Sequence, residues 1–181
     1  MTLDLKKLAR TNIWELLDPA DVKEALSNPP FLPLPSFLNI RDLGLVEGSP
    51  IKPGLVFTSG FLTLASPEDQ ATLVQKYGVK RIYDLRYDVE RVRVPEPQID
   101  GAEMIWVKTE LGTASPLEFY ATDGGVPAYV AGYRSLLKLH APAYERVFRD
   151  LIKFESGSIL YHCNGELKTV LSQVIRRDFN E

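Results

Sequence analysis

The sequence has one cysteine, Cys163, and two histidines among its 181 residues. An internal disulfide framework is therefore excluded, and because a lone thiol fits a reducing compartment we expect a cytoplasmic or nuclear protein. No run of about 18 apolar residues occurs, which predicts no membrane span. Lys and Arg number 21 against 24 Asp and Glu, a net charge of −3, and this balance gives no electrostatic basis for nucleic-acid binding.

Hydrophobic residues make up 45% of the chain and charged residues 25%, the proportions of a globular domain with a core. We expect residues 1–36 to form an N-terminal helix and a proline-rich arm, and residues 37–181 to form the main domain. The helix should begin at Asp18-Pro19, an N-cap followed by proline in the first turn. Four prolines within residues 29–35 exclude a helix or a central strand, and the apolar residues between them favour an arm that packs on the domain.

From Phe37 onward, short apolar segments alternate with helices that begin near proline. The predicted strands lie within residues 38–44, 55–59, 79–85, 101–107 and 158–163. The predicted helices are 66–78, 127–139, 142–154 and 168–179. This order predicts an α/β fold with a central sheet of four or five strands, parallel or mixed, and helices on both faces.

Apolar stripes at helical spacing are expected to face the core. The first two stripes are Tyr129, Tyr133, Leu136 and Leu137, then Tyr144, Val147, Phe148, Leu151 and Ile152. The predicted last helix carries a third: Val170, Leu171, Val174, Ile175 and Phe179. Since no later chain supplies a cover for this third stripe, we expect low stability or self-association through it.

Cys163 comes at the end of a predicted strand, before a glycine-containing loop and a helix. Ligands of open α/β sheets bind at the carboxyl ends of strands, and a helix N-terminus there holds anions and favours a thiolate. This spacing fits a nucleophilic cysteine. It fits equally well a buried cysteine that packs as a small hydrophobe.

Other residues have both a functional and a structural interpretation. Asp123, in the stretch ATDGG, is a candidate general acid, or a turn or helix-cap residue. Arg41 and Asp42 line the site or form an ion pair, and Asp84 pairs structurally with Arg86 or supports the site. His140 connects two helices. No cluster of His, Cys and carboxylates has metal-ligand spacing, so we predict no metal.

Four segments of the chain occur in a recognisable order. They read FLNIRDLG (37–44), IKPGLVFTSGFL (51–62), YGVKRIYDLR (77–86) and ILYHC (159–163). They resemble the motifs of the tyrosine-phosphatase-like family of fungal and bacterial proteins. The resemblance implies a cysteine-dependent phosphatase, without a cofactor, whose substrates are phosphorylated proteins (phosphotyrosine or phosphoserine), small phosphate monoesters or phosphoinositides.

The resemblance also assigns roles within the site. Cys163 becomes the nucleophile that forms a phosphocysteine intermediate, and His162 orients it. Lys168 takes the place of the arginine that clamps the phosphate oxygens. The residues of the loop that cradles phosphate on its N–H groups are Asn164, Gly165, Glu166, Leu167, Lys168 and Thr169.

This loop departs from the family pattern H-C-x-x-G-K-D-R-T. It is one residue shorter between Cys163 and Gly165, and Glu166-Leu167-Lys168 stand where the family has Lys-Asp-Arg. A lysine offers a point charge in place of a guanidinium fork, and the glutamate repels a phosphate. Only 18 residues follow Cys163, so we expect residues 37–181 to form a phosphatase-like domain that is incomplete at its C-terminus.

Three functions remain open at this point. The first is an active cysteine phosphatase, and the second is an inactive phosphatase-like binding or scaffold module, or a truncated gene product. The third is a rhodanese-like sulfur carrier, against which the four upstream segments argue. The first and third require a reactive thiol at Cys163, whereas the second does not.

Overall fold

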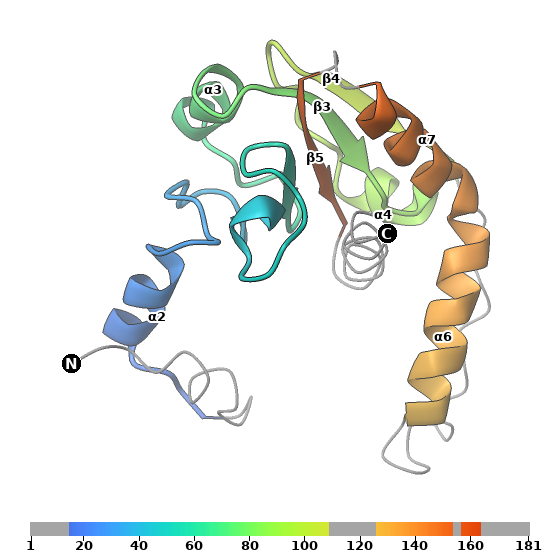
Figure 1. Ribbon diagram of the computed structural model, residues 1–181, viewed down its shortest axis with the longest axis horizontal. Coiled ribbons are helices and arrows are strands. Elements are labelled where there is room, and N and C mark those ends of the chain that lie inside the picture. Colours follow the sequence, from blue (N-terminus) through green and yellow to red (C-terminus); the bar gives the residue numbers. More distant parts are fainter. Residues whose placement is uncertain (1–14, 109–125, 154–156, 164–181) are drawn as a thin grey trace.

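The computed structural model describes residues 15–108, 126–153 and 157–163 (Figure 1). In this part the chain forms a five-stranded sheet with the order β1-β2-β5-β3-β4. The strands are β1 (Arg41–Asp42), β2 (Val56–Ser59), β3 (Val79–Asp84), β4 (Glu103–Trp106) and β5 (Ser158–His162). β1 is antiparallel to β2, and all the other pairs are parallel. The mixed α/β sheet predicted from the sequence is therefore confirmed.

The described helices are α2 (Pro19–Leu26), the short 3-10 helix η1 (Leu43–Leu45), α3 (Pro67–Gln75), α4 (Asp88–Arg93), α6 (Val126–Leu139) and α7 (Ala141–Ile152). Two of them, α2 and α3, begin at the caps that the sequence predicts. The Asp18 carboxylate accepts the Ala20 N–H at 2.8 Å, and the Ser66 hydroxyl accepts the Asp69 N–H at 3.2 Å. The sequence analysis missed α4. The predicted helix 168–179, with its apolar stripe, lies outside the described residues.

Two hydrophobic clusters lie on opposite faces of the sheet. On one face, α7 packs its Tyr144, Val147 and Leu151 in a cluster that also holds Tyr161 and Cys163. The Tyr83 hydroxyl on β3 donates to the Asp150 carboxylate on α7, which ties this helix to the sheet. The other face is covered by α3 and by the proline-rich arm, and its cluster includes Leu32, Leu34, Phe57, Leu73, Val79, Ile82 and Leu160. Figure 1 shows α3 and α7 on either side of the sheet.

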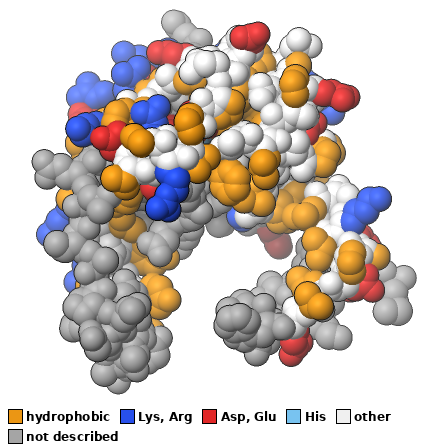
Figure 2. All heavy atoms as spheres, turned by 180° about the vertical axis from the view of Figure 1, so that it is seen from behind, with side chains coloured by type: hydrophobic (Ala, Val, Ile, Leu, Met, Phe, Trp, Pro, Cys, Tyr) orange, Lys and Arg blue, Asp and Glu red, His pale blue; other side chains and the backbone are white. Residues whose placement is uncertain are grey.

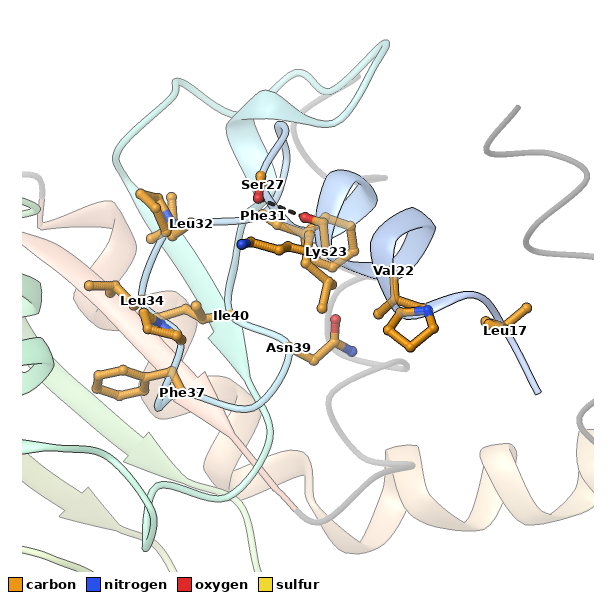
Figure 3. A pocket seen from close by; sticks show the side chains of 14 residues that line it. Leu17, Val22, Lys23, Ser27, Phe31, Leu32, Leu34, Phe37, Asn39 and Ile40 are labelled. Atoms are coloured by element: carbon orange, nitrogen blue, oxygen red, sulfur yellow. Dashed lines mark hydrogen bonds between the residues drawn. The ribbon is translucent and has the colours of Figure 1, made fainter. Parts of the chain in front are cut away.

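The arm packs on the sheet as the sequence predicted. Leu34 and Phe37 are buried in the α3 cluster, and the Leu32 N–H donates to the Ile40 carbonyl at 3.1 Å. Between the arm and α2 lies a mostly apolar cavity of about 640 Å³, shown in Figure 3 with Val22, Phe31 and Ile40 among its lining side chains.

The prediction that the apolar stripe of α6 is buried is wrong for most of its residues. Tyr129 is 52% exposed, and Tyr133 and Leu137 are also exposed, so that only Ala128 is buried on this helix. Hydrophobic side chains are visible at its surface in the view from behind (Figure 2). The described part of the chain places no element over them, because α6 extends away from the sheet (Figure 1). Ile152, at the last position of α7, is likewise 81% exposed rather than in the core.

Among the described residues, no helix combines the length and apolar character needed to cross a bilayer.

His140 joins α6 to α7, and the structure adds that it is fully buried. Its ring lies 5.0 Å from that of Tyr87 and 6.2 Å from that of Tyr144, measured between centroids. Neither ring nitrogen has a hydrogen-bond partner among the described residues. Burial lowers the pKa of His140 to about 4, against a weaker opposing effect of Glu90. The fold therefore holds this imidazole neutral near pH 7.

This buried imidazole predicts an acid-sensitive fold. An unfolded histidine titrates near pH 6.5, so the unfolded chain binds a proton between pH 6.5 and 4 that the folded chain does not. We expect the free energy of unfolding to fall by up to about 3 kcal/mol as the pH drops through this window. His140→Phe should remove most of this loss. Urea unfolding of both proteins at several pH values measures it, and an equal loss in both would contradict the prediction.

Candidate active site

The parallel strands bring four residues into one row at the carboxyl edge of the sheet. His162 on β5 pairs in register with Ser59 on β2 and with Asp84 on β3, which in turn pairs with Trp106 on β4. Cys163 follows His162 directly. This edge is where α/β sheets bind ligands, so the sole thiol of the chain lies at the expected position for a site.

Cys163 is held firmly at the end of β5. The Leu85 N–H donates to the His162 carbonyl at 2.9 Å, which fixes the backbone immediately before the cysteine. The side chain is 2% exposed and belongs to the cluster that α7 covers, together with Tyr144 and Tyr161. Because successive residues of a strand point to opposite faces, His162 lies on the other side of the sheet from this thiol.

A buried ionic network lies on the His162 side. Arg86 is fully buried, and its guanidinium donates to Asp84 Oδ1 and Oδ2, each at 2.9 Å, and to the Glu96 carboxylate. Its Nη1 also donates to the Val94 carbonyl at 2.9 Å. Arg91, from α4, donates to Asp84 Oδ2 at 2.8 Å. Two guanidinium groups thus face two carboxylates, so the charges of the network balance.

The network sets the protonation of its members. Burial acts to raise the pKa of Asp84, but the hydrogen bonds from Arg86 and the nearby His162 outweigh it and lower that pKa. Burial likewise acts to lower the pKa of Arg86, and the contact with Asp84 raises it instead. Both groups therefore stay charged at neutral pH.

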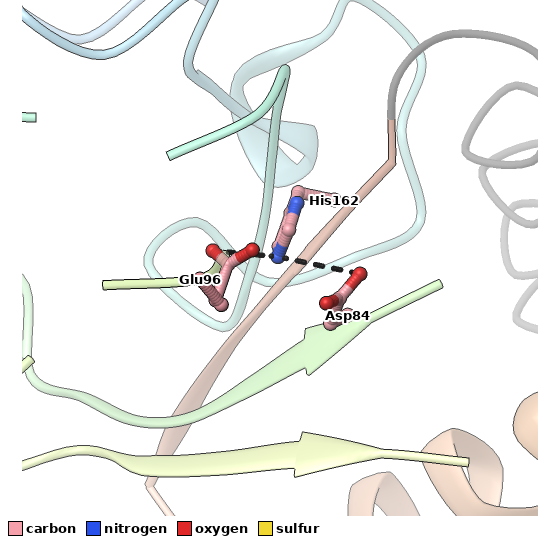
Figure 4. Close-up of side chains that lie close together, drawn as sticks. All are labelled: Asp84, Glu96 and His162. Atoms are coloured by element: carbon pink, nitrogen blue, oxygen red, sulfur yellow. Dashed lines mark ion pairs between the residues drawn. The ribbon is translucent and has the colours of Figure 1, made fainter. Parts of the chain in front are cut away.

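His162 completes the cluster, as Figure 4 shows. Its Nε2 lies 3.2 Å from Glu96 Oε1 and 4.0 Å from Asp84 Oδ1, and the ring is fully buried. The three side chains bring donor atoms within 4.8 Å of one another, a geometry that a metal ion accepts. Here Arg86 and Arg91 already supply positive charge to both carboxylates, so a divalent cation would meet repulsion. The cluster fits an internal ion network better than a metal centre.

The other predicted supporting residues lie on β1. Asp42 is buried, and its carboxylate accepts the N–H groups of Gly44 at 2.8 Å and Gly54 at 2.7 Å, which braces two turns. Arg41 is half-buried, with its guanidinium 5.5 Å from the centre of the Phe31 ring. Burial lowers its pKa, and the described residues offer it no carboxylate partner. It pairs with Thr58 on β2, so it lies toward the same edge of the sheet as Cys163.

Some of the predicted site residues lie outside the described part of the chain. They are Asp123 and the loop residues Asn164, Gly165, Glu166, Leu167, Lys168 and Thr169. Conversely, the sequence analysis missed Glu96, which stands between two prolines in a polar stretch and has no motif around it. It also treated Tyr144 only as a core residue, since helical spacing reveals burial but not which polar atom is buried.

The mixed sheet with helices on both faces is consistent with a phosphatase-like domain. The model of the tyrosine phosphatase family matches residues 32–165, well over half of the chain. The chain therefore belongs to the tyrosine phosphatase family, which confirms the resemblance found in the sequence. The match includes part of the proline-rich arm and extends past Cys163. A search of curated proteins finds no significant match.

The ionic network predicts a large effect of Glu96→Gln on stability. The glutamate side chain is 5% exposed, and neutralising it leaves Arg86 and His162 without a charged partner that they both contact. We expect a loss of about 3 kcal/mol in the free energy of unfolding. Glu103→Gln is the matched control, because Glu103 pairs with Arg81 at 3.0 Å while more than half exposed. That variant should lose less than about 1 kcal/mol. Urea titration measures both, and equal losses would contradict a structural role of the network.

Proposed function

We propose that this protein is a cysteine-dependent phosphatase-like protein that binds phosphate monoesters at the carboxyl edge of its sheet and hydrolyses them slowly. The observation that carries the proposal is the position of Cys163. It directly follows the central strand β5, at the edge where the parallel strands end, and lies within the region that matches the tyrosine phosphatase family. The substrates are phosphorylated proteins, carrying phosphotyrosine or phosphoserine, or small or lipid-linked phosphate monoesters.

The proposed reaction has two steps. In the first, the Cys163 thiolate attacks phosphorus, so that an S–P bond forms while the bond from phosphorus to the leaving oxygen breaks. That oxygen takes a proton from a general acid, for which Asp123 is the candidate. In the second step a water molecule attacks phosphorus and gives one proton to the Asp123 carboxylate, while the S–P bond breaks and inorganic phosphate leaves the regenerated thiolate. The complete cycle returns both the acid and the thiolate to their starting protonation.

The residues of the loop explain why turnover should be slow. The proposed clamp on the phosphate oxygens is Lys168, whose ammonium lacks the two parallel N–H donors of a guanidinium. Glu166 brings a negative charge to a loop that must hold a dianion. The loop sequence is also one residue shorter than the family pattern, and we propose that this changes how its N–H groups surround the phosphate. All three differences weaken transition-state stabilisation.

The same differences support a second candidate function, an inactive module that binds or scaffolds phosphorylated partners. Binding needs a complementary cradle but no reactive thiol, and Cys163 is only 2% exposed. The two functions differ in one measurable property, which is phosphate release that depends on Cys163.

The activity itself can be tested with a small aryl phosphate. Removal of one oxyanion-type donor typically lowers the rate by about 100- to 1,000-fold, so we expect turnover far below that of a phosphatase with an arginine clamp. Cys163→Ser should abolish whatever turnover remains, since no other residue is proposed to form the covalent intermediate. Phosphate release by the purified chain and by this variant is the measurement. Equal rates in the two proteins would eliminate the hydrolase and leave the binding module.

The proposed repulsion by Glu166 can be tested separately. Glu166→Gln removes one negative charge from the loop and should strengthen the binding of inorganic phosphate by about fivefold, the effect expected of one nearby charge in partly solvated surroundings. Glu145→Gln is the control, because it removes a glutamate that forms an exposed ion pair with Arg149 on α7. Titration calorimetry with phosphate measures both. Unchanged affinity in Glu166→Gln would show that this side chain does not face the bound anion.

A further inference from the structure

Tyr144 carries a buried hydroxyl group that the packing of α7 does not explain. The residue is 6% exposed, and its hydroxyl oxygen has no hydrogen-bond partner among the described residues. A buried polar atom without a partner costs free energy, and native proteins rarely retain one without a reason. A phenylalanine would fill the same place in the core without this cost.

This hydroxyl belongs to the surroundings of Cys163. The two residues lie in one hydrophobic cluster, on the face of the sheet that α7 covers. Burial, together with the charge of the Cys163 thiolate and that of Tyr87, raises the pKa of Tyr144. The phenol therefore keeps its proton, and remains a hydrogen-bond donor, throughout the pH range in which thiols ordinarily titrate.

Among the groups around Tyr144 and Cys163, the Tyr144 phenol is the suitable hydrogen-bond donor to a thiolate. His140, at the junction of α6 and α7, packs against Tyr144 but is neutral near pH 7, and Glu90 on α4 is negatively charged. Tyr87 precedes α4, and its ring makes an edge contact with that of His140. On the opposite face of the sheet, His162, Asp84, Glu96, Arg86 and Arg91 form the charge-balanced network.

The start of α7 positions the backbone of Tyr144. The Tyr144 backbone N–H donates to the His140 carbonyl at 3.0 Å, and the centroids of the two rings lie 6.2 Å apart. No described residue competes for the hydroxyl, so it is available as a donor to a thiolate.

We propose that the Tyr144 hydroxyl, which makes no hydrogen bond to any described residue in the structure, donates one to Cys163 once this cysteine ionises, and so favours the thiolate, the nucleophilic form of the cysteine. This inference rests on the proposed role of Cys163 and adds a residue on α7, outside the loop and the motifs of the family. The hydroxyl is then kept in the core for the sake of the thiolate rather than for the stability of the fold.

The test is the pH profile of alkylation, because Cys163 is the sole cysteine and every labelled thiol reports on it. The rate of reaction with iodoacetamide is measured from pH 5 to 10 in the wild-type chain and in Tyr144→Phe. We expect the midpoint of the profile to move up by about one pH unit in the variant, with about tenfold slower labelling below the midpoint. The plateau at high pH, which reports access to the thiol, should stay unchanged.

Two controls separate this role from a structural one. Tyr133→Phe removes a hydroxyl from the neighbouring helix α6, where the side chain is partly exposed, and should leave the profile unchanged. Tyr144→Phe should melt at the same temperature as the wild type or higher, since it removes a buried polar atom without a partner. In denaturant all three proteins should be labelled alike.

An unchanged midpoint in Tyr144→Phe, an equal shift in Tyr133→Phe, or a marked loss of thermal stability in Tyr144→Phe would each overturn the inference. Alkylation does not depend on phosphate release, which the aryl phosphate assay measures separately. If the alkylation midpoint shifts while that assay finds no turnover, the proposed hydrolysis is refuted and the thiolate contact is still supported.

Discussion

The burial of one guanidinium group determines how the carboxyl edge of this sheet is built. Arg86 has no exposed surface, and a buried cation is tolerated only when anions and hydrogen-bond acceptors surround it. Asp84, two residues earlier on β3, supplies one carboxylate, and Glu96 returns from beyond α4 to supply the second. The helix α4 also places Arg91 in an ion pair with Asp84. His162 then occupies the remaining side of the network, so the end of the central strand β5 is anchored through its side chain as well as its backbone.

The alternation of β5 separates two different environments at this edge. His162 points into the ionic network, whereas Cys163 points toward α7 and its aromatic residues. A thiolate on the network side would meet two carboxylates at close range, and its negative charge would be disfavoured. On the α7 side it shares a hydrophobic cluster with Tyr161 and Tyr144, whose phenol keeps its proton. The strand thus places a rigid anchor and the proposed nucleophile on adjacent residues without electrostatic conflict.

Much of this architecture follows from local sequence signals. The caps at Asp18 and Ser66, the apolar segments of the strands and the prolines of the arm each predicted an element, because each depends on neighbouring residues alone. Glu96 and Tyr144 gave no such signal, since their importance arises from contacts with β5 and β3 that no spacing within the chain reveals. The expected burial of Tyr129 and Tyr133 was wrong for a related reason. Helical periodicity shows which residues share a face, but it cannot show whether another element covers that face.

The distribution of cations at this edge bears on how a phosphate would be held. Arg86 forms ion pairs with Asp84 and Glu96, and Arg91 forms one with Asp84. Neither arginine can bind a phosphate without breaking these ion pairs. Arg41, half-buried toward the same edge, has no carboxylate partner among the described residues. In the proposed site, a phosphate beside Cys163 would therefore depend for positive charge on Lys168 and Arg41, and for hydrogen bonds on the loop N–H groups. The slow turnover that we propose would follow from this arrangement, because a lysine lacks the fork of a guanidinium and Arg41 lies on β1 rather than in the loop.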